Sequence, residues 1–140
     1  MPVYEINPLT DPRWNDLATS HPGASVFHSR PWLEALSHSY GYEPAALTTT
    51  SPGQALQNGI VFCRIKSSFT GSRIVSLPFS DHCQPLVSTA GDLTELIQHL
   101  KETVTAQGWK YLELRPMEVI GPEVPTGLAP SSLFCIHKLD

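Results

Sequence analysis

Cysteine is scarce in this sequence, and its few copies lie far apart. The 140 residues include three cysteines, Cys63, Cys83 and Cys135. An odd number at wide spacing argues against a disulfide framework, and the lack of any Cys-x-x-Cys pair argues against a zinc ribbon. We therefore expect a reduced, cytoplasmic protein whose cysteines serve as small apolar residues.

Charge is sparse as well. Charged residues make up 16% of the chain, with 9 Lys and Arg against 13 Asp and Glu, for a formal net charge of −4. The basic residues are scattered, so we expect no surface for DNA or anionic lipid. No apolar run approaches the ~18 residues of a membrane helix, and the first residues lack the basic start and apolar stretch of a secretory signal. The sequence predicts neither a membrane span nor a DNA partner.

Glycine-rich phosphate-binding motifs are missing too. All nine glycines are isolated, and no G-x-x-x-x-G-K-[ST], G-x-G-x-x-G or G-x-S-x-G pattern occurs. There is also no arginine or glutamine followed by glycines at the spacing that lets a helix start hold the diphosphate of coenzyme A. We expect this chain to bind no such cofactor by itself.

What the sequence does contain is typical of a globular domain. Hydrophobic residues make up 41% of the chain, and 140 residues suffice for one core. Thirteen prolines divide the chain into short elements, which favours a mixed α/β domain over a helical bundle. Strands are predicted at 3–6, 24–29, 43–50, 59–68, 73–79, 109–116 and 133–140.

Three amphipathic helices are predicted between these strands. They begin at Thr10 or Asp11, at Ser29, and at Asp92 or Thr94, and they end before Pro22, at Gly41 and at Gly108. The strands at 59–68 and 73–79 are expected to pair as neighbours. The last of the three helices implies a crossover connection in the sheet.

The stretch SDHC places three reactive side chains in a row, Asp81, His82 and Cys83. Neighbours on an extended chain point to opposite sides, so the three do not readily converge on one atom. A zinc site would need further ligands at a suitable spacing, and none is visible, so no metal is expected. We interpret the stretch as a polar loop at a strand end, shaped by Asp81, with an inert Cys83. A thiol enzyme built on Cys83 is a distant alternative.

The stretch YLELRP is a second polar cluster. As a strand it would turn Leu112 and Leu114 to one side, and Tyr111, Glu113 and Arg115 to the other. Glu113 and Arg115 could pair with each other or with a neighbouring residue. Arg115 could instead hold an anionic ligand, since guanidinium matches carboxylate and phosphate in two-pronged fashion.

Four segments, in this order, resemble a known family. They are SVFHSRPWLEALSHSYGYEP (25–44), GIVFCRIKSSFTGSRIVSLPFSDHCQPLV (59–87), GWKYLELRP (108–116) and HKLD (137–140). Together they resemble the first half of Fem-type, GNAT-related acyltransferases, which comprise the peptidoglycan bridge-forming aminoacyltransferases and their acetyltransferase-like relatives. The resemblance implies an α/β fold at 1–140, one GNAT-like N-terminal lobe with a central mixed sheet flanked by about three helices.

The resemblance also implies a function. It suggests the N-terminal lobe of an enzyme that moves an acyl or aminoacyl group to an amine, in cell-wall or cell-surface polysaccharide metabolism. Acyl-coenzyme A or aminoacyl-tRNA would be the donor in the full-length parent, and a small molecule or a peptidoglycan precursor the acceptor. Residues of the matching loop and strand become candidate substrate contacts: Ser80, Asp81, His82, Glu113 and Arg115. No catalytic residue is carried over.

The second lobe of such enzymes does not follow in this sequence, and we expect the 140 residues to be inactive alone. The partner would then be that lobe, or another copy of this chain that associates through an exposed sheet edge. The alternative is a non-catalytic module that keeps the fold to bind a ligand or a partner.

Overall fold

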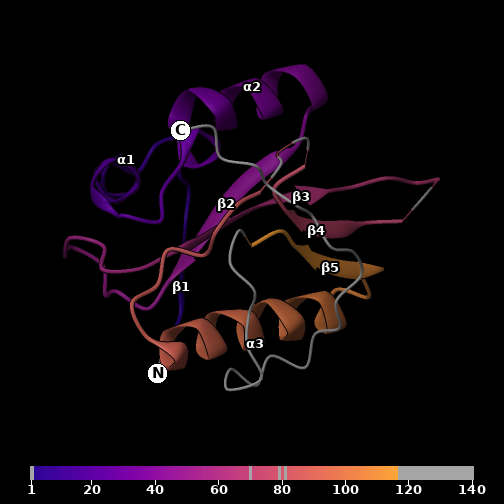
Figure 1. Ribbon diagram of the computed structural model, residues 1–140. Helices are drawn as coiled ribbons and strands as arrows, with labels where there is room; N and C mark the ends of the chain where they lie inside the picture. Colours follow the sequence, from indigo (N-terminus) through magenta and orange to yellow (C-terminus); the bar gives the residue numbers. More distant parts are fainter. Residues whose placement is uncertain (1, 70, 79, 81, 117–140) are drawn as a thin grey trace, which may run out of the picture.

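A computed structural model describes residues 2–69, 71–78, 80 and 82–116 of the chain (Figure 1). Its strands are β1 (Tyr4–Ile6), β2 (Glu43–Thr48), β3 (Ile60–Ile65), β4 (Arg73–Ser76) and β5 (Tyr111–Leu114). Its helices are α1 (Pro12–Ser20), the 3₁₀ turn η1 (Val26–His28), α2 (Arg30–Tyr40) and α3 (Ala90–Ala106). The mixed α/β class is therefore confirmed. The predicted strand at 133–140 lies outside the described residues.

The strands form one sheet in the order β1-β2-β3-β4-β5. The first four are antiparallel neighbours, which includes the predicted pairing of the segments at 59–68 and 73–79. The last pairing, between β4 and β5, is parallel, with Arg73 opposite Tyr111 and Val75 opposite Glu113. A parallel neighbour requires a crossover, and α3 provides it as predicted.

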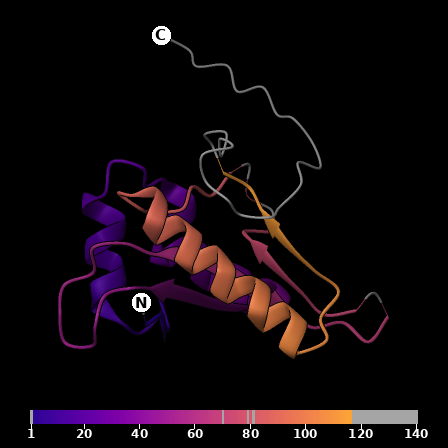
Figure 2. The same ribbon diagram turned by 90° about the horizontal axis from the view of Figure 1, so that it is seen from below.

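Different helices cover the two faces of the sheet, as Figures 1 and 2 show. Helices α1 and α2 pack on one face. The buried residues there are Trp14, Leu17, Leu33, Leu36, Ala46, Val61, Cys63, Ile65, Val75, Leu77, Cys83 and Leu86. Helix α3 lies across the other face, over Ala45, Leu47, Ile60, Phe62 and Ile74, with Leu96 and Leu100 on its apolar stripe. Alternation along each strand supplies both cores at once.

Helix ends follow local side-chain chemistry. Asp11 caps α1, where its carboxylate accepts a hydrogen bond from the backbone N–H of Arg13, and the Arg13 side chain holds the pKa of Asp11 below its usual value. Gly41 ends α2 in the left-handed conformation at φ +66°, as predicted. The predicted start of α3 was wrong by a few residues. Thr89 caps this helix, because its hydroxyl accepts the N–H of Asp92.

Residues 24–29 form no strand, contrary to the expectation from sequence. Ser25 and His28 instead close a capping box around the η1 turn: the Ser25 hydroxyl accepts the Phe27 N–H at 3.3 Å, and His28 Nδ1 accepts the Ser25 N–H at 2.9 Å. Such side-chain bonds compete with strand pairing for the same backbone groups. The turn brings His28 into the core, where it is fully buried.

A substitution at Gly59 tests how tightly α1 packs on the sheet. A Cβ at this position would lie 2.7 Å from Cζ3 of the buried Trp14, so we expect Gly59→Ala to lower the free energy of unfolding by about 1–3 kcal/mol. Urea denaturation measures the change. Gly91→Ala is the matched control, since the nearest atom would be 3.8 Å away, and it should be neutral or slightly stabilising. Equal effects at the two glycines would contradict the packing described.

Candidate functional site

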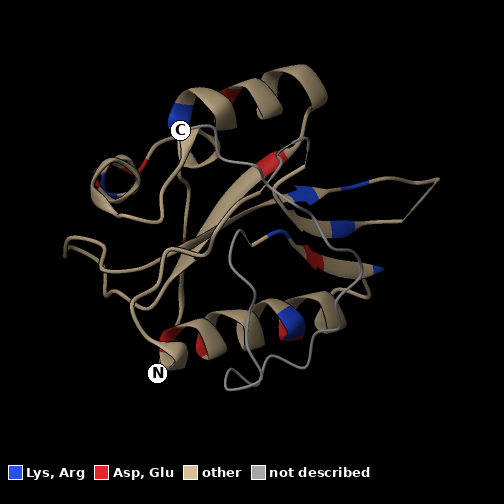
Figure 3. Ribbon diagram, viewed as in Figure 1, with Lys and Arg blue, Asp and Glu red and all other residues tan. Residues whose placement is uncertain are grey.

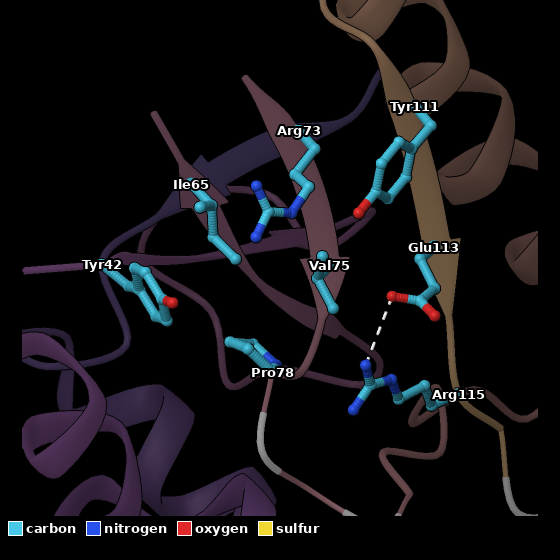
Figure 4. A pocket seen from close by; sticks show the side chains of 8 residues that line it. All are labelled: Tyr42, Ile65, Arg73, Val75, Pro78, Tyr111, Glu113 and Arg115. Atoms are coloured by element: carbon cyan, nitrogen blue, oxygen red, sulfur yellow. Dashed lines mark hydrogen bonds and ion pairs between the residues drawn. The ribbon is translucent and has the colours of Figure 1, made fainter. Parts of the chain in front are cut away.

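A cleft of about 240 Å³ opens beside the parallel pair β4 and β5, on the face of the sheet that carries α1 and α2 (Figure 4). We call it the β4–β5 cleft. Buried apolar residues form part of its wall, and two tyrosines, two arginines and a glutamate supply its polar groups. The residues that line it are Tyr42, Ile65, Arg73, Val75, Pro78, Tyr111, Glu113 and Arg115.

Strand geometry explains why these side chains meet. Side chains two residues apart on a strand share a face, so Tyr111, Glu113 and the following Arg115 point to the cleft. Leu112 and Leu114 point to the other face and pack in the α3 core. The predicted division of the YLELRP stretch is therefore confirmed.

Glu113 and Arg115 form an ion pair within the cleft. Arg115 Nη2 lies 3.4 Å from Glu113 Oε2, as one of the two sequence-based alternatives predicted. Their side chains are 30% and 35% exposed, for Arg115 and Glu113 respectively, and pairs at this exposure contribute little net stability. The pair is therefore open to exchange with a charged ligand, and the anion-binding alternative for Arg115 stays a prediction.

A chain of hydrogen bonds holds Arg115 from behind. Its Nη1 donates to the carbonyl of Ser80 at 3.2 Å, and the Ser80 hydroxyl accepts from Trp32 Nε1 of α2 at 2.9 Å. The backbone of Arg115 is fixed as well, since its carbonyl accepts the N–H of Cys83 at 2.6 Å. Ser80 is buried and does not line the cleft, so the structure gives it a positioning role toward Arg115.

His82 lies on the same loop but packs against the η1 turn and does not line the cleft. Its ring packs edge-on against Phe27, with ring centroids 5.1 Å apart. Its Nδ1 is buried and has no hydrogen-bond partner among the described residues. Asp81 lies outside the described residues, so its predicted role in shaping the loop stays a prediction. Of the five candidate contacts, the structure brings Glu113 and Arg115 together in the cleft.

Sequence reasoning missed Arg73 and Tyr42 as cleft residues. Arg73 could have been found once the parallel pairing was known, because it lies opposite Tyr111 and shares a strand face with Val75. Tyr42 lies between α2 and β2, and no local pattern in the sequence assigns it to the cleft.

The thiol of Cys83 meets a histidine that the sequence did not suggest. Its Sγ lies 3.6 Å from Nε2 of His28, not His82. Both nitrogens of His28 are occupied: Nδ1 accepts the Ser25 N–H, and Nε2 donates to the carbonyl of Gln84 at 2.7 Å. Burial lowers the pKa of His28 and raises the pKa of Cys83 to about 12. The pair is thus neutral and structural, and it argues against a Cys83 nucleophile.

The start of α3 does not suit the diphosphate of a cofactor. The Thr89 hydroxyl already accepts the N–H of Asp92, and the Asp92 carboxylate in the first turn would repel a phosphate. In the same described ranges, no group of three or more His, Cys, Asp or Glu side chains is placed to hold a metal ion. Nor is any helix there long and apolar enough to cross a bilayer.

Buried thiols should resist alkylation in the folded protein. Burial raises the pKa of both Cys63 and Cys83 to about 12, so almost no thiolate is present near neutral pH. We expect iodoacetamide to leave both unlabelled in native protein and to label both in guanidinium, as read by peptide mass spectrometry. Fast labelling of Cys83 in the native protein would contradict this prediction and support the hypothesis of a thiol enzyme.

His28 should make stability depend on pH. Its folded pKa is lowered from 6.5, chiefly by burial, with smaller contributions from the charges of His82 and His21. The unfolded state therefore binds the proton first, and the free energy of unfolding should fall as the pH drops below about 6.5. His28→Gln, which can keep both hydrogen bonds and does not titrate, should flatten this slope between about pH 7.5 and 5.5. Equal slopes in the original protein and the His28→Gln variant would contradict the assignment.

Comparison with known proteins adds the fold and nothing finer. No protein-family model matches the chain, and neither does any curated protein. A solved structure described as "Crystal structure of a probable acetyltransferase" superposes with a TM-score of 0.54 and 14% sequence identity, over 100% of this chain and 97% of that one. At this identity the similarity is one of fold alone: the two chains share an arrangement in which helices cover a mixed five-stranded sheet.

Proposed function

We propose that this chain carries the acceptor site of an acyltransferase, which moves an acyl group from an activated donor to an amine. The observation that supports it is the β4–β5 cleft. It lies beside the parallel strand pair of a GNAT-like sheet and presents a carboxylate, two guanidinium groups and two phenols to a small ligand. These are the groups that an amine acceptor and a developing oxyanion need.

In this proposal Glu113 and Arg115 divide the work. An amine must lose a proton to attack a carbonyl, and Glu113 supplies the one carboxylate among the described residues of the cleft. The guanidinium of Arg115, held by Ser80, is placed to bind and orient a negatively charged group of the acceptor. Ser80 and His82 shape the loop behind it, and Asp81 is a candidate contact on the same loop.

The donor in this proposal is held outside the described residues. The first turn of α3 does not fit the diphosphate of acyl-coenzyme A. The acyl-coenzyme A or aminoacyl-tRNA suggested by the Fem-type resemblance would therefore be bound by a second lobe or a second copy of the chain. A peptidoglycan precursor or another small amine would be the acceptor, in cell-wall or cell-surface metabolism.

Transfer assays test this proposal. The complete gene product that carries these residues is incubated with acetyl-coenzyme A or alanyl-tRNA and a panel of amines, and products are identified by mass spectrometry. We expect an acceptor-dependent product with one donor, and a drop in kcat/KM of about a hundredfold for Glu113→Gln, since it removes the proton acceptor. Glu34→Gln, on the exposed surface of α2, is the matched control and should retain activity.

Two results would overturn the proposal. One is the lack of product with either donor from folded protein, and the other is full activity in Glu113→Gln. Saturable ligand binding without transfer would instead support the non-catalytic binding module.

A further inference from the structure

The β4–β5 cleft combines both signs of charge in a small space. Arg73 and Arg115 bring two guanidinium groups and Glu113 brings one carboxylate, in a chain whose net charge is −4. Figure 4 shows these three side chains around the cleft, with Tyr111 beside Arg73. A ligand that enters must therefore be matched to charges of opposite sign.

Ligands with one kind of charge fit this pattern poorly. A simple anion would be attracted by the two arginines but repelled by the carboxylate of Glu113. A simple cation would be attracted by Glu113 but repelled by the two guanidinium groups. Like charges that come together in a partly desolvated site repel each other, so either ligand would lose part of its binding free energy. A zwitterion, which carries an ammonium and a carboxylate, satisfies both sides.

Arg115 is prepared for the carboxylate of such a ligand. One hydrogen bond to the Ser80 carbonyl and one contact with Glu113 fix its orientation, and each uses a different terminal nitrogen. A guanidinium carries five N–H donors, so these two interactions leave donors for a two-pronged bond to a carboxylate. Because the side chain is already ordered, little further entropy is lost when the ligand binds.

Glu113 is similarly suited to an ammonium. Its carboxylate is about one third exposed, and its Oε2 faces Arg115 at 3.4 Å. A carboxylate accepts about four hydrogen bonds, so it can receive an ammonium while it stays beside Arg115. The two halves of the ion pair are close enough to contact groups on a single carbon of the ligand.

We propose that the β4–β5 cleft binds the head group of an α-amino acid, with the ammonium on Glu113 and the carboxylate on Arg115. Arg73 adds the second cation, and the buried side chains of Ile65, Val75 and Pro78 provide an apolar wall. The volume of about 240 Å³ lies below the ~300–1,000 Å³ of pockets for larger ligands and suits a molecule of this size. The inference rests on the proposed function and deepens it, since it names the acceptor as an α-amine flanked by a carboxylate.

Binding to the full chain without any acyl donor tests the inference. The twenty L-amino acids are screened by thermal shift, and the tightest is measured by calorimetry beside its amide, which lacks the carboxylate, and its N-acetyl form, which lacks the ammonium. We expect saturable binding of the free amino acid and at least about tenfold weaker binding of both derivatives. Equal binding of either derivative, or no binding by any amino acid, would overturn the proposal.

Matched variants locate the binding. Glu113→Gln should abolish the preference for the free amino acid over its N-acetyl form, and Arg115→Gln should abolish the preference over the amide. Arg73→Gln tests the cationic side separately, because loss of the Ser80 contact could unfold the Arg115 variant. Arg30→Gln and Glu34→Gln remove an exposed ion pair on α2, outside the cleft, and should change neither preference. Unaltered selectivity in all three folded cleft variants would contradict the site.

The two proposals fail in distinguishable ways. Selective amino-acid binding without acyl transfer would keep this site and remove the enzymatic function. Transfer to an amine that lacks a carboxylate, at the same rate as to the amino acid, would keep the function and remove the zwitterion site.

Discussion

The parallel pairing of β5 with β4 is the constraint on which the rest of the site depends. Helix α3 makes this pairing possible. Its apolar stripe around Leu96 and Leu100 packs on one face of the sheet, and the helix carries the chain back to the end of the sheet at which β4 begins. The register then fixes Glu113 beside Val75 and Arg115 beside the loop that follows β4. The cleft forms only when β4 and β5 pair, because the whole of α3 separates these two strands in the sequence.

The loop after β4 shows how reactive residue types can serve packing. Its serine, histidine and cysteine are bound by indole, aromatic ring and imidazole groups from the segment that joins α1 to α2 and from α2 itself. The buried polar atoms are expensive unless paired, and Trp32, Ser80 and the carbonyl of Gln84 supply most of the partners. The residue with the inert thiol also helps to order Arg115, because the N–H of Cys83 donates to the Arg115 carbonyl. The loop therefore supports the cleft through Ser80 and through Cys83.

Local patterns predicted the elements and one face of the site. Alternation in YLELRP placed Glu113 and Arg115 correctly, and the helical spacing of leucines found α3, because both signals lie within one element. The features that the sequence did not predict depend on contacts between distant residues, or on side-chain hydrogen bonds that compete with strand pairing. The η1 turn depends on a capping box that outweighs strand propensity, and the contact of His28 with Cys83 joins residues 55 positions apart. Arg73 lines the cleft because β4 pairs with β5, and no local sequence pattern reveals that pairing.

Strand β4 places Arg73 and Val75 toward the cleft and Ile74 toward α3. A slip of one residue in its pairing would turn the guanidinium into the apolar layer beneath α3 and leave the isoleucine among the polar groups. Burial of an unpaired cation is among the most costly errors a sheet can make. Arg73, the second cation of the proposed ligand site, thus also fixes the alignment of the strand.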